Sequence, residues 1–369
     1  MTTAKAPGKL YLAGEYAVTL SGQPSVVIAV DRFVTADVTR RTDDQLVVAS
    51  DQLGEQNWPV SELPTLPLTD DWRLVIRTLQ VLNDYLLDNG QPVTGLTVSI
   101  KSHLNADNGQ KLGLGSSAAV VVALIKTVID DYELPMTPEQ RFKLAALITL
   151  TTPNFKAGSM GDIAAASLGG VILYSKFDTE VITEWIDSNR YFSEIIARDW
   201  PLLRLERLGF PADWQLLVGW TGAPADTQQM LAQGATSVDK QHAKQLLAQN
   251  TAPLVNMLVE GLRRMDYDKV ATALRLNQEQ LFTYTSQVGV SYMTPQLLTL
   301  LSTASELGAS AKISGAGGGD NGIAITNNPL VAKALTQAWL AAGIQPLPLS
   351  IATFIGENDY GICPRTPQR

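Results

Sequence analysis

The segment GLGSSA at residues 113–118 has the composition of a phosphate-binding loop. Glycines let the backbone approach an anion closely, and the loop N–H groups, with the N-terminus of the apolar helix expected after them, form a positive site. A hydroxyl at Ser116 or Ser117 can donate to a phosphate or join the coordination of Mg²⁺. Taken alone, the segment equally allows a tight helix start that packs on a sheet and binds nothing.

Two familiar nucleotide-binding patterns do not fit this loop. A dinucleotide fingerprint needs a buried strand before its first glycine and an acidic residue about 20 positions later. Here the polar stretch NADNGQK at 105–111 precedes the loop, and Asp130 and Asp131 come too early. The P-loop pattern G-x-x-x-x-G-K-[ST] is also absent.

Two charged residues could act on a phosphate held in the loop. Lys9, in KAPGKLYLAGEY, is either a solvated charge or a cation beside the reacting group. Asp162, in FKAGSMGDIAAA, begins a helix of small residues, where it could cap the helix or place a carboxylate near a substrate hydroxyl. Glu15 lies in an apolar frame, which favours a structural ion pair or cap over catalysis.

A second glycine-rich segment, SGAGGGD at 314–320, connects two predicted strands. Its glycines cost conformational entropy on folding, so the turn is expected to approach another group closely.

The composition restricts the class of protein. The chain has 369 residues, 45% hydrophobic and 17% charged, which is typical of a soluble globular protein with room for two domains. The net charge of −8, without a Lys/Arg cluster, predicts no nucleic-acid partner. A single cysteine, Cys363, and two distant histidines, His103 and His242, argue against disulfides and a zinc site. No signal peptide or apolar stretch of about 20 residues is present, so we expect a cytoplasmic protein outside the membrane.

The periodicity of apolar residues predicts a mixture of strands and helices. A change of pattern near residue 176 predicts two domains, 1–175 and 176–369. Thr137 is expected to cap a helix that has Pro138 in its first position. The predicted strands lie at 9–14, 24–30, 34–40, 45–50, 95–104, 171–177 and 214–220, and the predicted helices at 71–90, after the loop, after 137, within 237–286, and at 294–307 and 329–343.

Three segments, in this order, resemble the signature motifs of the GHMP small-molecule kinases: PGKLYLAGEYAV, GLGSSAAV and SGAGGGDNGIA. Two further blocks, GSMGDIAAASLGGVILYSKFD and GWTGAPADT, resemble the phosphomevalonate kinase branch of that family more than the mevalonate kinases or the decarboxylase. The resemblance implies an α+β fold of two domains, with mainly antiparallel sheets flanked by helices and an active-site cleft between the domains.

The resemblance also implies an activity. It is the ATP- and Mg²⁺-dependent phosphorylation of (R)-5-phosphomevalonate to 5-diphosphomevalonate, by direct in-line transfer, in the mevalonate route to isoprenoids. The expected partners are therefore ATP and phosphomevalonate, and the expected oligomeric state is a monomer or homodimer. The 1–175 domain would bind ATP, and the 176–369 domain would complete the acceptor site.

Residue roles carry over from the matching motifs. Lys9 would stabilise charge that develops in transfer, and Asp162 would accept or orient a proton. The residues implied to bind ATP are Gly113, Leu114, Gly115, Ser116, Ser117 and Ala118, with Ser117 also near Mg²⁺. The residues implied to bind the acceptor are Ser159, Gly222, Ala223, Pro224, Ala225, Ser314, Gly315, Ala316, Gly317, Gly318 and Asp320.

The chain departs from the family pattern in three places. Residues 149–161 contain no carboxylate, so a second Mg²⁺ ligand is unassigned, and the loop lacks the proline often found before its first glycine. Asn321 stands where many of the resembled enzymes have cysteine. Two alternatives stay open: a mevalonate kinase, or a catalytically silent metabolite sensor. The basic residues that would recognise an acceptor phosphate are not ranked among Lys101, Lys156 and Arg190.

Overall fold

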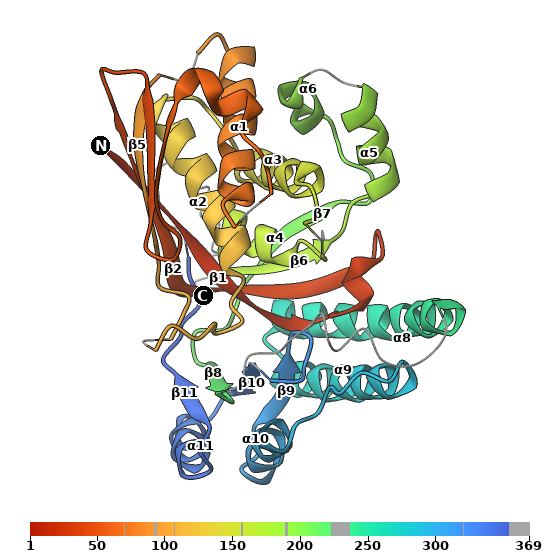
Figure 1. Cartoon of the computed structure of the whole chain (residues 1–369). Coiled ribbons are helices and arrows are strands. Elements are labelled where there is room, and N and C mark those ends of the chain that lie inside the picture. The colour runs from red at the N-terminus through yellow and green to blue at the C-terminus, as the bar shows by residue number, and fades with distance from the viewer. Residues whose placement is uncertain are drawn as a thin grey trace, which may run out of the picture.

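The computed structural model describes residues 1–69, 71–91, 94–106, 108–155, 158–188, 191–222, 237–319 and 321–353. Its strands are β1 (Thr2–Ala13), β2 (Pro24–Arg40), β3 (Gln45–Ser50), β4 (Gly54–Pro59), β5 (Leu96–Ser102), β6 (Val171–Ser175), β7 (Arg204–Leu208), β8 (Gln215–Trp220), β9 (Ser310–Ser314), β10 (Asn321–Thr326) and β11 (Gln345–Leu347) (Figure 1). Its helices are η1 (Ala17–Thr19), η2 (Val60–Thr65), α1 (Arg73–Asp88), α2 (Ser116–Asp131), α3 (Pro138–Thr151), α4 (Gly161–Leu168), α5 (Thr179–Ser188), α6 (Phe192–Ala197), α8 (Ser237–Arg264), α9 (Tyr267–Gln287), α10 (Pro295–Glu306) and α11 (Pro329–Ala341).

The first sheet has seven strands in the order β4-β3-β5-β2-β6-β7, with β1 paired to β2. The β3–β5 pair is parallel, and the other pairs of this sheet are antiparallel. The mainly antiparallel α+β fold expected from the sequence is therefore confirmed.

The break predicted between residues 30 and 34 is wrong, because β2 continues through it. The register with β1 shifts there, from Pro7 opposite Phe33 to Gly8 opposite Val30, so the extra residues form a β-bulge. The bulge lies opposite the β1 residues that lead into Lys9, where it bends the strand without ending it.

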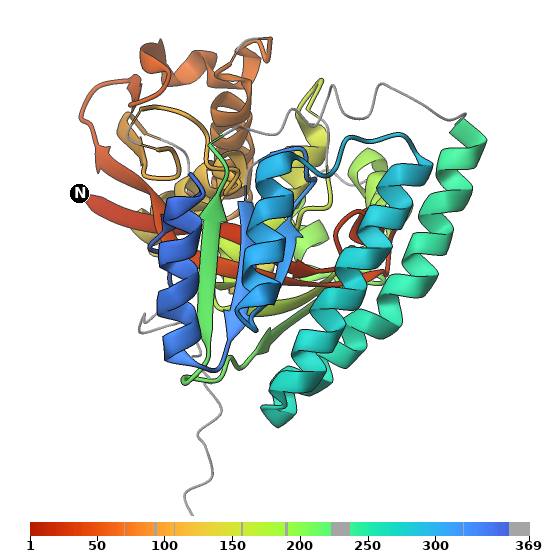
Figure 2. The same cartoon turned by 90° about the horizontal axis from the view of Figure 1, so that it is seen from below.

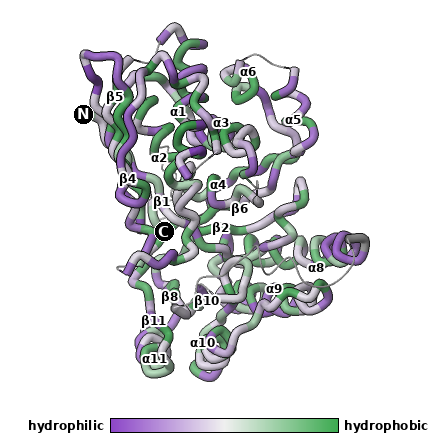
Figure 3. The backbone as a smooth tube through the Cα atoms, in the orientation of Figure 1, coloured by the Kyte–Doolittle hydropathy of each residue, from purple (hydrophilic) through white to green (hydrophobic). Residues whose placement is uncertain are grey.

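Helix α2 lies at the centre of the elements that pack on the first sheet. It packs against β1, β2, α1, α3 and α4, and most of its residues from Ala118 to Ile129 are buried. A helix that is apolar over most of its surface must be covered over most of it, which explains why the sequence shows only a narrow polar face here. Figure 3 shows the hydrophobic residues concentrated on the inner elements of this part of the fold.

The second sheet is antiparallel, in the order β11-β8-β10-β9. Helices α10 and α11 lie over one face of it, and α8 and α9 form a long pair beside it (Figure 2). Gly219 and Gly322 are register partners on β8 and β10, and a Cβ on either would come within 2.8 Å of a Leu300 side-chain carbon. The two glycines therefore let α10 approach the sheet closely.

Helix starts are set by local chemistry that the sequence partly reveals. The side chain of Thr137 accepts from the N–H of Gln140, and Pro138 opens α3, as predicted. The alternative of an N-cap at Asp162 is wrong, because Met160 caps α4 and Asp162 is already helical. Met160 adopts a φ of 61°, so the cap lies two residues before the position that the sequence suggests.

Strand β7 pairs with β6 and so extends the first sheet beyond residue 175, whereas β8 belongs to the second sheet. The division into 1–175 and 176–369 stays a prediction. Across the described ranges, no helix has both the length and the hydropathy needed to span a membrane.

Candidate active site

Three segments that are distant in sequence meet at Gly115. A Cβ placed on Gly115 would lie 3.1 Å from the Cβ of Asp162 and 3.2 Å from the Cγ of Lys9. The loop, the strand β1 and the helix α4 thus converge at this glycine and leave little room for a side chain. The structure brings together the three motifs that the sequence singled out for phosphate chemistry.

The Gly-Ser loop ends at the N-terminus of α2. Gly113 and Gly115 have φ angles of 69° and 80°, a region that favours glycine, and Gly115 is the residue before the first helical turn. Ser117 is exposed there, and the Ser116 hydroxyl lies 3.4 Å from that of Ser102 at the end of β5. The free N–H groups of this turn and an exposed hydroxyl are suited to bind an anion.

Lys9 is held against the loop by both its backbone and its side chain. Its N–H donates to the carbonyl of Leu114 at 2.8 Å, and its Nζ donates to the carbonyl of Gly113 at 3.2 Å. The Nζ also lies 5.5 Å from the ring centroid of Tyr11, two residues along the strand on the same face. The half-buried ammonium is therefore aimed at the loop rather than at bulk solvent.

Asp162 faces Lys9 from the first turn of α4. Burial raises the pKa of its carboxyl, and the charge of Lys9 and the N–H of Ile163 oppose that rise. The N–H of Ile163 donates to Oδ1 at 3.0 Å. A carboxylate with a raised pKa beside a lysine is suited to accept a proton.

Tyr11 and Ser159 form a hydrogen-bonded pair in the neighbourhood of Asp162. Their hydroxyls are 2.6 Å apart, and Tyr174 donates its hydroxyl proton to the Ser159 carbonyl at 2.8 Å. A Cβ on Gly161 would lie 2.1 Å from the Tyr11 hydroxyl oxygen, so only glycine fits at that position. Ser159, predicted to bind the acceptor, thus contacts the hydroxyl of Tyr11, and the ring of Tyr11 lies beside the ammonium of Lys9.

The glycine turn of the second sheet is tied to β1 by Ser314. The Ser314 hydroxyl accepts from the N–H of Tyr11 at 2.8 Å and donates to the carbonyl of Tyr11 at 3.1 Å. Tyr16 donates to the carbonyl of Ala316 at 2.6 Å, and a Cβ on Gly317 would lie 2.1 Å from the Tyr292 ring. The close approach predicted for this turn is confirmed.

A buried ion pair joins the same turn to the chain after β1. Lys312 is paired with Glu15, and both side chains are almost fully buried. Burial lowers the pKa of Lys312, and Glu15 opposes that effect. The N–H of Gly315 points to the same Glu15 oxygen at 3.4 Å. The expectation of a structural role for Glu15 is confirmed.

Asn321 links β10 to the phosphate loop. Its side-chain amide donates to the carbonyl of Leu112 at 2.6 Å, and the side chain is fully buried. The residue that replaces a family cysteine therefore holds the start of the Gly-Ser loop against the second sheet.

Several predicted residues are not placed by these contacts. Gly222 is described, with a φ of 78°, but Ala223, Pro224, Ala225, Asp320, Lys156 and Arg190 lie outside the described residues. Lys101 is exposed and precedes Ser102 on β5. Because side chains alternate along a strand, Lys101 points away from the face on which Ser102 meets the loop.

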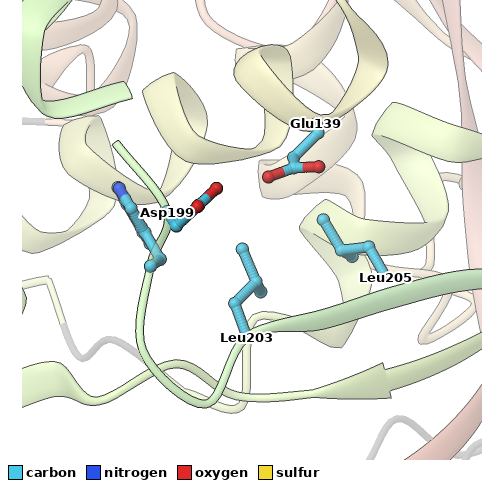
Figure 4. Close-up of a pocket in the computed structure, with 5 residues that line it drawn as sticks. Glu139, Asp199, Leu203 and Leu205 are labelled. Atoms are coloured by element: carbon cyan, nitrogen blue, oxygen red, sulfur yellow. The ribbon is translucent and has the colours of Figure 1, made fainter. Parts of the chain in front are cut away.

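Sequence reasoning missed Tyr11 as part of this region, and also Lys176, whose Nζ donates to the carbonyl of Gly158 at 3.1 Å. It noted Asn321 only as a departure from the family pattern. The i, i+2 spacing of Lys9 and Tyr11 on a strand could have indicated Tyr11, whereas no local signal identifies Lys176. A separate hollow of about 230 Å³ is lined by Glu139, Asp199, Trp200, Leu203 and Leu205 (Figure 4). It contains none of the predicted site residues, and Glu139 already pairs with Lys143 at 2.7 Å.

A divalent cation would find few protein ligands here. Over the residues that the structure describes, no group of three or more His, Cys, Asp or Glu side chains is arranged to hold a metal. Mg²⁺ is commonly bound by one or two protein oxygens together with substrate phosphates. The exposed Ser117 hydroxyl fits that donor set, so the site suits Mg²⁺ that arrives with a nucleotide.

The chain was compared with known protein families and proteins. The GHMP kinases N-terminal domain model matches residues 73–170, and the GHMP kinases C-terminal model matches residues 258–345. A phosphomevalonate kinase of Streptomyces sp. (strain CL190) is 34% identical over 94% of this chain and 96% of its own length. A mevalonate kinase of Thermococcus sibiricus is 26% identical over 86% of both chains.

Among solved structures, the Streptococcus pneumoniae phosphomevalonate kinase in complex with phosphomevalonate and AMPPNP superposes with a TM-score of 0.84. It is 28% identical, and the match covers 95% of this chain and 100% of that one. With both family models matched and a relative similar over nearly its full length, the chain belongs to the GHMP kinase family.

Proposed function

We propose that the chain transfers the γ-phosphoryl group of ATP to phosphomevalonate and forms diphosphomevalonate for isoprenoid synthesis. The observation that carries this proposal is the convergence of Lys9, Gly115 and Asp162, which places a cation, a phosphate loop and a carboxylate at one point. The similarity to phosphomevalonate kinases over almost the whole chain supports the choice of acceptor.

The loop from Gly113 to Ala118 binds the triphosphate through its N–H groups and the N-terminus of α2. Ser117 would hold Mg²⁺, and the ion would neutralise phosphate charge when it is bound. Lys9 already lies against the loop carbonyls, so its ammonium is positioned before substrates arrive. Positioning and charge stabilisation supply most of the acceleration in this type of transfer.

The transfer itself needs no covalent enzyme intermediate. An oxygen of the acceptor phosphate attacks the γ-phosphorus in line, the bond from that phosphorus to the bridging oxygen breaks, and ADP leaves with the electron pair. A phosphomonoester has a second pKa of about 6, so the attacking oxygen is mostly deprotonated at neutral pH. Asp162 then accepts the remaining proton of the monoanion and orients the nucleophile.

The acceptor lies between Ser159 and the turn from Ser314 to Gly318. Ser159 presents its hydroxyl next to Tyr11, and the turn is fixed by the Ser314 contacts to β1. Roles for Gly222, Ala223, Pro224, Ala225 and Asp320 in the acceptor pocket rest on the motif resemblance.

The proposal is tested by ADP release with ATP and Mg²⁺ on four acceptors: phosphomevalonate, mevalonate, homoserine and galactose. Turnover on phosphomevalonate alone is expected. Turnover on mevalonate instead would favour the second candidate, a mevalonate kinase, which the 26% identical relative makes the natural competitor. No turnover on any acceptor, with ATP binding intact, would favour a metabolite sensor.

A further inference from the structure

Lys176 is a buried lysine next to the acceptor region. It follows β6 directly, its residue is 6% exposed, and its Nζ donates to the carbonyl of Gly158 at 3.1 Å. Gly158 precedes Ser159, whose hydroxyl contacts that of Tyr11. The chain of contacts therefore runs from Lys9 over the Tyr11 ring to Ser159 and ends at Lys176.

A second lysine, Lys244, approaches Lys176 from α8. The two are close enough that the charge of Lys244 lowers the pKa of Lys176, in addition to the larger effect of burial. Burial also lowers the pKa of Lys244, which is half-buried. Helix α8 packs against η1, and Ala243 lies in a cluster with Tyr16. The N–H of Gly22, shortly after η1, donates to the carbonyl of Lys176 at 2.7 Å, so both lysines lie beside the segment that follows β1.

The two lysines differ from the other buried lysines in their counter-charges. Lys312 pairs with Glu15 and Lys143 pairs with Glu139. By contrast, no ion pair joins Lys176 or Lys244 to a carboxylate among the described residues, and no described carboxylate contributes to the lowered pKa of either lysine. A buried lysine next to a half-buried one, with no partner among the described carboxylates, is costly, and an anion that binds between them removes that cost.

We propose that Lys176 and Lys244 form a subsite that binds the carboxylate end of the acceptor. This inference rests on the proposed function, because phosphomevalonate carries an anionic group at each end of its carbon skeleton. The reacting phosphate lies beside Lys9 and Asp162, so the opposite end reaches past Tyr11 and Ser159 to the lysine pair. Lysines suit a carboxylate at this place because each offers a compact charge with rotatable donors.

The subsite is tested by calorimetric binding of three ligands to the full chain. Mevalonate carries the carboxylate alone, isopentenyl phosphate carries the phosphate alone, and phosphomevalonate carries both. In Lys176→Met and Lys244→Met, the Kd for mevalonate and phosphomevalonate should rise roughly 10- to 100-fold, the value of a lost charge-assisted hydrogen bond. The Kd for isopentenyl phosphate and the KM for ATP should not change.

Lys126→Met serves as the matched control, because Lys126 is also a half-buried helical lysine and its removal changes the net charge equally. It should leave all three Kd values unchanged. Thermal unfolding identifies a variant that fails to fold. If Lys176→Met does so, Lys244→Met decides the question, and Lys176→Arg should retain binding.

Two results would overturn the inference. Weaker binding of isopentenyl phosphate with unchanged mevalonate binding would assign the lysines to the phosphate, and unchanged Kd values for all ligands would leave Lys176 only as a partner of the Gly158 carbonyl. If wild-type mevalonate binding is too weak to measure, phosphomevalonate against isopentenyl phosphate makes the same distinction. Wild-type turnover of phosphomevalonate, measured on the same preparation, separates a failed subsite from a failed proposed function.

Discussion

Lys312 and Lys176 are both buried lysines near the site, but the groups that face them differ. Lys312 has a carboxylate, Glu15, and a carbonyl, that of Ile313 at 2.6 Å. Lys176 has a carbonyl and a second lysine. In the first arrangement the charge of Lys312 is balanced by Glu15, and the pair joins the two sheets. In the second, two positive charges face each other. Burial alone does not distinguish a lysine that stabilises the fold from a lysine that binds a ligand. The presence of a counter-charge does.

Glu15 and Asp162 extend the comparison to carboxylates. Glu15 lies among support residues that join the sheets: Glu15, Lys312, Ser314 and Asn321. Asp162 lies among site residues whose charges are only partly compensated: Lys9, Asp162, Lys176 and Lys244. If the distinction holds, changes in support residues reduce stability, and changes in site residues reduce activity while stability is kept.

Asp162→Asn is expected to give the largest effect on activity. The kcat should fall roughly a hundredfold or more, because the proton acceptor is lost. The melting temperature at pH 7 should stay the same or rise. The raised pKa of Asp162 favours folding below the unfolded pKa of about 3.9, and this contribution disappears as the pH rises through the folded pKa. A large loss of stability would place Asp162 among the support residues.

Lys312→Met should be the most destabilising change among the support residues. It leaves the Glu15 carboxylate buried without its partner, which costs about 3–5 kcal/mol in the free energy of unfolding. Urea denaturation measures this cost. The double variant with Glu15→Gln should recover much of it, since no unpaired charge remains. If the double variant is as unstable as the single one, the pair is not the source of the loss.

Asn321→Ala should reduce stability less, and it should also weaken the binding of ATP. It leaves the Leu112 carbonyl without its donor, which costs about 1–3 kcal/mol, and it releases the start of the Gly-Ser loop, so the KM for ATP should rise several-fold. Asn328→Ala is the control, because it removes the α11 cap at a cost of about 1 kcal/mol and lies outside the site. Equal KM values in the two variants would argue against a role of Asn321 in loop position.

The pH dependence should show the smallest effect. In the wild type, kcat should fall as the pH drops through the raised pKa of Asp162, by about tenfold for each unit below it. The acceptor phosphate also titrates near pH 6, so the same profile is measured for Asp162→Asn. A profile with the same slope in both proteins would assign the titration to the substrate.

Local motifs in the sequence predict the site better than they predict its supports. The loop from Gly113 to Ala118, Lys9 and Asp162 are each visible in short segments, and the family resemblance predicts that they meet. The helix caps at Thr137 and Pro138 depend on neighbours within one turn, so they are also predictable.

Long-range pairings are what the sequence does not reveal. The apolar frame of Glu15 indicates an ion pair, but its partner Lys312 lies 297 positions away. Lys176 and Lys244 come from a strand end and a helix, and nothing in either local pattern connects them. The continuous β2 was missed because a β-bulge interrupts the apolar pattern in the same way as a strand end.

The reciprocal bonds of Ser314 to Tyr11 restrict the motions open to this enzyme. Two hydrogen bonds to one residue of β1, with the Glu15–Lys312 pair and the Asn321 amide nearby, fix the second sheet at the centre of the interface. Rotating one sheet against the other would break these contacts, at about 1 kcal/mol for each neutral hydrogen bond and more for the ion pair. We therefore expect the two sheets to stay joined at this point through the catalytic cycle, since a hinge there would have to break all of these contacts together.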